Sequence, residues 1–246
     1  MKKYVDMRQI LQNRLAKNEI LDPRLFDFGG EMHPDVREKI LSLVQSAIDR
    51  TIKNIPGLHV TDIYLRGSSA GYYYREDSDL DVAVQVQKKD APWLSDDDKK
   101  LAEFLKILQQ GNCFPLRLMP GSRFIDLSFQ TSAAEKDISI YSILHNKWKN
   151  VPDPHLADML VFDDIWQEYL SDYQKIDTYL LKMQISGKLH TMEGIEELEK
   201  YYAALYSEQR FSYRPHLIYK LLKIRGIIAK IQELISASMR ELLSLK

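Results

Sequence analysis

Two aspartates separated by a single residue are the side chains in this sequence best suited to chemistry. From Asp79 onward polar and apolar residues alternate, so Asp79 and Asp81 share one face of a predicted strand while Leu80 and Val82 share the other. Carboxylates at this spacing lie about 7 Å apart at Cα and can converge on the same cation. Hard divalent cations such as Mg²⁺ take oxygen ligands of this kind, commonly together with substrate phosphates. The pair therefore predicts a metal site.

A glycine–serine turn precedes the aspartates by ten intervening residues. Gly67 and Ser68 follow a predicted strand over residues 60–66. Glycine lets backbone N–H groups approach a polyphosphate without a Cβ in the way, and Ser68 adds a hydroxyl donor. Beside the turn, Arg66 is a candidate phosphate contact, with a surface ion pair as the alternative. Tyr73 is a candidate for stacking on a nucleobase, with ordinary packing as the alternative.

A third carboxylate lies on a later predicted strand, over residues 123–130. Asp126 is on its polar face, opposite Ile125 and Leu127. A sheet that is packed on one side only has an open second face, and all three aspartates are expected to project from it. Two metal ions held by three carboxylates are suited to in-line nucleotidyl transfer.

These segments resemble the nucleotidyltransferase superfamily typified by DNA polymerase beta. Residues 65–68 (LRGS) and 78–82 (SDLDV) match its signature of a hydrophobic strand, Gly-Ser, about ten residues and Asp-x-Asp, followed by a later acidic strand. Roughly residues 20–155 also look like uncharacterised predicted nucleotidyltransferases of large bacteriophages and bacteria. The resemblance implies an α+β fold, in which a mixed sheet with helices on one face is followed by a C-terminal helical bundle.

The resemblance also implies an activity, the transfer of a nucleoside monophosphate from an NTP such as ATP to a hydroxyl acceptor, with release of pyrophosphate. Asp79, Asp81 and Asp126 would bind two Mg²⁺ or Mn²⁺ ions, and Gly67 and Ser68 would hold the outer phosphates. The acceptor stays open between a protein, an RNA, a small molecule and a second nucleotide. Two alternatives remain, a cyclic-oligonucleotide synthase-like signalling enzyme and a non-catalytic nucleotide- or RNA-binding module. A structural role, for example in a phage particle, is neither supported nor excluded.

Composition places the chain among ordinary globular proteins. Among its 246 residues, 34 Lys and Arg balance 35 Asp and Glu, so the overall charge indicates neither nucleic acid nor membrane as a partner. Cys113 is the single cysteine, which excludes an internal disulfide. No apolar stretch indicates an export signal or a membrane span, and we expect a cytoplasmic protein. The sequence does not predict the oligomeric state.

Helical patterns and breaks predict three regions: a helical arm and linker over residues 1–32, a catalytic core over 33–154, and a helical domain over 155–246. In the core, a helix starts at Pro34, because proline suits the first helical position.

Further predictions concern individual elements. Ser95 and the acids after it are expected to cap a second helix of the core, and a Pro-Gly turn at 120–121 is expected to join two strands. The helical domain is expected to contain helices over 156–185, 191–209 and from Pro215 to the C-terminus.

The last predicted helix is locally basic, with seven Lys or Arg and two Glu from Phe211 onward. In the superfamily that the chain resembles, a helical domain often supplies a cation to the outer phosphates of the nucleotide. Lys220 and Lys223 are the candidates for that contact. The alternatives are a solvated face or a basic contact for RNA, and we expect a structural role for His216.

Overall fold

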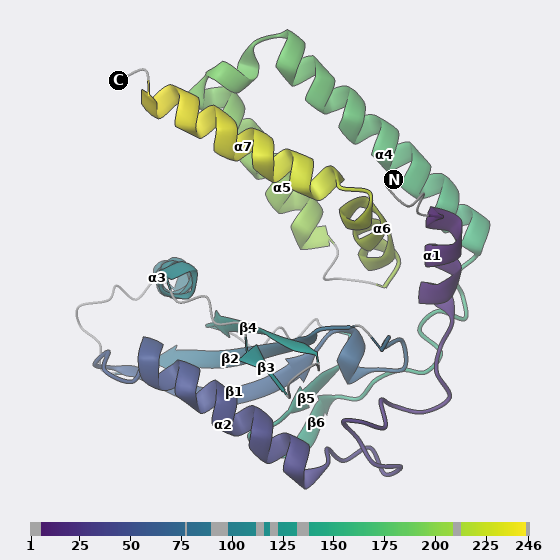
Figure 1. Cartoon of the computed structure of the whole chain (residues 1–246), viewed down its shortest axis with the longest axis vertical. Helices are drawn as coiled ribbons and strands as arrows, with labels where there is room; N and C mark the ends of the chain where they lie inside the picture. Colours follow the sequence, from purple (N-terminus) through teal and green to yellow (C-terminus); the bar gives the residue numbers. More distant parts are fainter. Residues whose placement is uncertain are drawn as a thin grey trace. The chain divides into compact units, whose positions relative to one another are not determined.

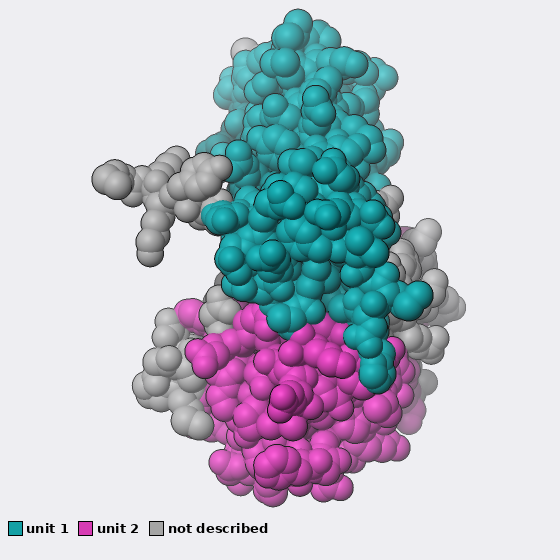
Figure 2. All heavy atoms as spheres, turned by 90° about the vertical axis from the view of Figure 1, so that its right-hand side faces the viewer, with its two compact units in different colours: residues 1–16, 155–246 teal, residues 17–154 magenta. Residues whose placement is uncertain are grey.

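The computed structural model describes residues 6–76, 78–89, 98–111, 116–118, 123–131, 138–208 and 213–244. The chain splits into two compact units, one of Lys17–Pro154 and one of Met1–Ala16 with His155–Lys246 (Figure 2). The predicted arm over residues 1–32 is thus divided between the two units. Two sequence predictions, the cap at Ser95 and the turn at 120–121, lie outside the described residues, as does Cys113.

A six-stranded mixed sheet forms the centre of the Lys17–Pro154 unit (Figure 1). Its strands are β1 (Leu58–Arg66), β2 (Leu80–Lys88), β3 (Leu116–Arg117), β4 (Phe124–Gln130), β5 (Ile140–Ser142) and β6 (Lys147–Asn150), in the order β3-β4-β2-β1-β5-β6. β2 and β4 pair in parallel, whereas the other neighbours are antiparallel. The structure confirms the predicted α+β class with a mixed sheet.

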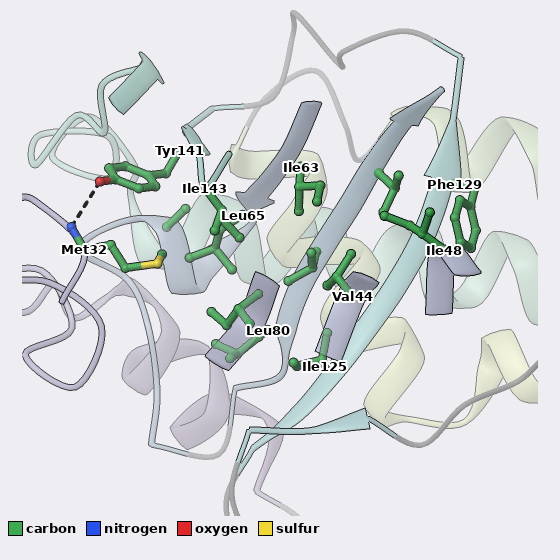
Figure 3. Packing of buried hydrophobic residues seen from close by; sticks show 14 of the residues in the cluster. Met32, Val44, Ile48, Ile63, Leu65, Leu80, Ile125, Phe129, Tyr141 and Ile143 are labelled. Carbon is green, nitrogen blue, oxygen red and sulfur yellow. Dashed lines mark hydrogen bonds between the residues drawn. The ribbon is translucent and has the colours of Figure 1, made fainter. Parts of the chain in front are cut away.

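Helices α2 (Pro34–Thr51) and α3 (Asp98–Gly111) contribute apolar side chains to the core of this sheet. Proline occupies the start of α2, as the sequence predicts. Val44 and Ile48 are four residues apart on α2 and so share one face of the helix. They belong to the same buried cluster as Leu65 of β1 (Figure 3). Each fully buried side chain of this kind contributes about 1.5–3 kcal/mol to folding. This face of the sheet therefore packs against the helices and forms the hydrophobic core.

The segment leading into α2 is fixed by aromatic side chains. Trp148 of β6 stacks on Phe26 at 5.2 Å between ring centroids, and its indole N–H donates to Gly30 O at 2.8 Å. Tyr141 of β5 contacts both rings edge-on, and its hydroxyl accepts from the buried backbone N–H of Met32 at 3.1 Å (Figure 3). Residues before α2 are therefore part of this unit.

In the second unit, the regular elements among the described residues are all helices. It contains α1 (Met7–Leu15), α4 (Phe162–Ile185), the short 3₁₀ helix η2 (Lys188–His190), α5 (Met192–Glu208), α6 (Tyr213–Ile224) and α7 (Ile227–Ser244). Arg8 of α1 pairs with Asp163 of α4 at 3.2 Å, and the Tyr213 hydroxyl donates to Arg14 O at 2.8 Å. These contacts bind α1 to helices that follow it by about 150 residues or more in the sequence.

The prediction of one continuous helix from Pro215 to the C-terminus is wrong. Gly226 has a φ of +86° and separates α6 from α7. This left-handed conformation costs glycine little but strains any residue with a Cβ, so glycine permits the break. In the part of the chain that the structure describes, no helix is both long and apolar enough to cross a membrane.

Candidate functional site

The strand register brings two of the three predicted acids together. Asp81 of β2 is the Cα partner of Arg66 on β1 and of Asp126 on β4. Because directly paired residues share a face, the three charged side chains form one row across neighbouring strands, about 4.8 Å apart. Asp126 is exposed and Asp81 is half-buried, so both are accessible. The row lies on the face opposite Leu65 and Val82, which belong to the apolar core.

Gly67 ends β1 and lies against the carboxylate of Asp81. Its backbone has a φ of 73° and a ψ of −159°, a combination that is essentially restricted to glycine. A Cβ at this position would lie 2.5 Å from Asp81 Oδ2, closer than such atoms normally approach. The glycine is thus required by both conformation and space, and the phosphate-turn candidate is adjacent to the metal-site candidate.

Asp79 lies immediately before β2 and is exposed. The preceding turn, η1 (Ser68–Ala70), holds its backbone: the buried Ser69 Oγ donates to Asp79 O at 2.8 Å. Ser68 Oγ lies 3.4 Å from Ser78 Oγ, next to Asp79 in the chain. The glycine–serine turn and the first aspartate are therefore linked directly.

The prediction of an open second face is wrong for part of β1 and β2. Tyr64 and Ala83 form the next residue pair on the same face, two residues along each strand from Arg66 and Asp81. Both are completely buried. Lys149 of β6 lies over the Tyr64 ring, 5.8 Å from its centroid, and forms an ion pair with the buried Asp62. Among the described residues, the accessible charged side chains at this end of the face include the row of Arg66, Asp81 and Asp126 and the neighbouring Asp79.

Arg66 is held at the edge of this row by polar side chains of β4. With the Gln130 amide oriented so that its oxygen faces Arg66, the guanidinium donates to that oxygen at 2.9 and 2.8 Å. Its Nη2 also lies 3.5 Å from Ser128 Oγ. The positive charge beside Asp81 is therefore fixed in place.

Among the described residues, no three His, Cys, Asp or Glu side chains are gathered closely enough to form a ready metal centre. The donors of Asp79, Asp81 and Asp126 are nevertheless all carboxylate oxygens, the ligand type that Mg²⁺ and Mn²⁺ prefer. Asp79 and Asp126 are exposed, so their side chains have room to rotate toward a cation.

Tyr73 occupies a packing position. Its ring is 7% exposed, and its hydroxyl donates to Pro154 O at 3.1 Å. This burial fits the packing alternative and not the prediction of stacking on a nucleobase.

Lys220 and Lys223 lie on α6, in the other unit, and their predicted contact with nucleotide stays a prediction. Neighbouring cations of the basic segment are engaged within that unit. Arg214 donates to Glu168 at 2.6 Å, and Lys230 donates to Asp177 at 2.9 Å.

His216 has a structural environment. Burial, aided by the positive charges of Lys220 and Arg14, lowers the pKa of His216 from 6.5 to about 3. The side chain is therefore neutral at pH 7 and stacks on Tyr213 at 6.2 Å between ring centroids.

Sequence reasoning missed three residues that organise the loop carrying Asp79. The completely buried Asp22 pairs with Arg24 and with Arg123, which immediately precedes β4. Arg123 Nη2 donates to Arg75 O at 2.9 Å. The available signal was the Asp-Pro-Arg sequence at 22–24, in which an aspartate starts a turn and the following arginine can pair with it.

The Lys17–Pro154 unit also contains a groove of about 770 Å³ away from these residues. It lies beside α2 and is lined by residues that include His33, Arg37, Gln45 and Asn146. None of the predicted site residues lines it.

Comparison of the chain with known protein families, curated proteins and solved structures found no match.

Proposed function

We propose that the chain is a metal-dependent nucleotidyltransferase that joins a nucleoside monophosphate from an NTP to a hydroxyl acceptor. The observation that carries the proposal is the pairing of Asp81 with Asp126 on parallel strands, with Gly67 packed directly against the Asp81 carboxylate. The candidate phosphate turn and two candidate cation ligands are thereby adjacent at the accessible end of one sheet face.

The three aspartates fit divalent metal by the chemistry of their donors, since all are carboxylates and two belong to adjacent strands. Asp79, Asp81 and Asp126 would hold Mg²⁺ or Mn²⁺. When bound, such ions neutralise the charge that develops on the leaving pyrophosphate and favour the ionised acceptor. Asp126 on β4 is more exposed than Asp81 on β2. It would therefore be the more accessible of the two to an acceptor.

The remaining residues of the candidate site would bind and orient the nucleotide. Backbone N–H groups of the turn that begins at Gly67, together with the Ser68 hydroxyl, would donate to the β- and γ-phosphates. Arg66, fixed by Gln130, would add positive charge beside them. The acceptor oxygen forms a bond to the α-phosphorus while the bond from that phosphorus to the bridging oxygen breaks. Asp126 would accept the proton of the acceptor hydroxyl, and pyrophosphate leaves.

The first test is label transfer from each NTP, with Mg²⁺ or Mn²⁺, in the presence and absence of cell-extract protein and RNA. Wild-type protein is expected to label a product, whose identity names the acceptor. Asp81→Asn and Asp126→Asn should each lower the rate at least about 100-fold, because each removes a charged ligand. The matched control is Glu38→Gln, an exposed acid on α2, which should leave the rate unchanged.

Absence of labelling by a folded wild-type protein, with every nucleotide and extract, would contradict the proposal. The non-catalytic alternative would then be tested by RNA binding as a function of salt. Binding through the basic residues of α6 should weaken steeply as salt rises and should survive Asp81→Asn.

A further inference from the structure

A buried ion pair holds the loop between η1 and β2. Asp22 is completely buried, and the Arg123 side chain that pairs with it is 9% exposed. Asp22 Oδ1 also accepts from Arg24 Nε at 2.9 Å and from Arg24 N at 3.1 Å. A charge buried without partners costs several kcal/mol, so these contacts fix Asp22 and Arg123 in one arrangement.

The rest of the Arg123 guanidinium binds the loop itself. Nη2 donates to Arg75 O at 2.9 Å, Nε donates to Glu76 O at 3.3 Å, and Nη1 lies 3.4 Å from Ser69 Oγ. Arg24 Nη1 reaches the same Glu76 carbonyl at 3.4 Å. The planar fork of an arginine, with five N–H donors, suits contacts in these several directions at once.

The same loop is held from the N-terminal side. Asn18 Nδ2 donates to Tyr72 O at 2.9 Å and to Tyr74 O at 3.0 Å. The backbone N–H of Asn18 donates to Tyr72 O at 2.8 Å. Groups outside the loop thus bind four of its carbonyl oxygens, those of Tyr72, Tyr74, Arg75 and Glu76.

These contacts connect two of the candidate metal ligands. Arg123 lies three residues before Asp126 and directly precedes β4. Through Ser69, whose hydroxyl donates to Asp79 O, it is also linked to the backbone of Asp79. One guanidinium therefore ties the start of the Asp126 strand to the loop that ends at Asp79.

We infer that Arg123, held by the buried Asp22, is a positioning residue that fixes the backbone of Asp79 relative to Asp126 and thereby sets the affinity for divalent metal. The inference rests on the proposed function, since it assumes that these aspartates bind metal. Arg123 would act through its contacts with Asp22, the loop carbonyls and Ser69, and it is assigned no contact of its own with metal or substrate. Residues that orient metal ligands in this way typically change metal affinity 10- to 100-fold when altered.

The test is Mn²⁺ binding to nucleotide-free protein, measured from the electron paramagnetic resonance of free Mn²⁺. Arg123→Lys keeps the charge next to Asp22 but loses the fork, and is expected to weaken Mn²⁺ binding about 10- to 100-fold. Ser69→Ala removes the link to Asp79 O and leaves the ion pair intact. We expect it to weaken binding about 3- to 10-fold.

Arg37→Lys is the matched control. Arg37 also donates to two backbone carbonyls of this unit, Ile143 O at 2.7 Å and Leu144 O at 2.8 Å, but neither belongs to the loop. It should bind Mn²⁺ as the wild type does. Thermal unfolding of every variant separates a positioning effect from a loss of fold, and Ser69→Ala decides the matter if Arg123→Lys does not fold.

The outcomes separate the inference from the function on which it rests. Weaker binding by the two variants, restored activity at saturating Mn²⁺ and an unchanged Arg37→Lys protein would support it. If the wild type binds Mn²⁺ and a folded Ser69→Ala or Arg123→Lys protein binds it equally well, the inference is overturned while the proposed function stands. If the wild type does not bind Mn²⁺ with or without nucleotide, both are overturned.

Discussion

Gly67→Ala should destabilise the protein more than other glycine substitutions at positive φ. The φ and ψ of Gly67, 73° and −159°, belong to a region that costs a residue with a Cβ about 1–3 kcal/mol. The new Cβ would also lie 2.5 Å from Asp81 Oδ2, so the carboxylate must leave its rotamer, at about 0.5–1.5 kcal/mol. The sum predicts a free energy of unfolding lower by about 1.5–4.5 kcal/mol.

Gly30→Ala is the control for the steric part of this effect. Gly30 has a φ of +80° in the same unit, but its added Cβ would meet only Trp148 Nε1 at 3.5 Å and Leu21 Cδ1 at 3.6 Å, which are ordinary contacts. We expect a loss of about 1–2 kcal/mol there. Denaturant unfolding followed by circular dichroism measures both variants.

A double-mutant cycle isolates the contact with Asp81. In an Asp81→Ala background the carboxylate is absent, so Gly67→Ala should cost about 1 kcal/mol less than in the wild type. Gly67→Ala alone should also weaken Mn²⁺ binding, because the new Cβ displaces the Asp81 carboxylate. Two results would contradict this prediction. One is a free energy of unfolding for Gly67→Ala within about 0.5 kcal/mol of the wild-type value, and the other is an equal cost of Gly67→Ala with and without Asp81→Ala.

Two further predictions concern the core and the helical unit. Tyr141→Phe leaves the buried N–H of Met32 without its acceptor and removes the 2.9 Å bond to Asn146 Oδ1, so the free energy of unfolding should fall by about 1–2 kcal/mol. An unfolding midpoint equal to that of the wild type would contradict this. Because burial lowers the pKa of His216 from 6.5 to about 3, the unfolded chain takes up the proton first as the pH falls. Stability should therefore be full above pH 6.5 and decline toward pH 3 by at most about 1.4 kcal/mol per pH unit, and His216→Gln should abolish that part of the decline in pH-dependent thermal unfolding.

The sequence made the local parts of the candidate site predictable. Alternation placed Asp81 and Asp126 on the polar faces of their strands, and a glycine at the end of β1 indicated a close backbone approach. Both signals act over a few residues. Whether Asp126 pairs with Asp81 or with Ala83 depends on the register of two strands that are distant in sequence, and no local pattern specifies it.

Long-range contacts account for what could not be predicted. Asp22 and Arg123 are about a hundred residues apart, and neither looks unusual within its own segment. The burial of Tyr64 likewise depends on residues outside its strand, such as Lys149 over its ring, so alternation alone suggested an open surface there. The break at Gly226 was missed because an isolated glycine is compatible with a continuing helix as well as with a left-handed stop.

The division of the helical unit into two sequence segments has a consequence for folding during synthesis. All described strands lie within Lys17–Pro154, so the sheet can assemble as soon as that stretch has left the ribosome. Helix α1 precedes the sheet in the sequence, yet its partners Asp163 and Tyr213 belong to α4 and α6, which follow the sheet. An isolated helix of nine residues is marginal in water. Helix α1 is therefore expected to become stable only after the sheet and the helices that follow it have been synthesised.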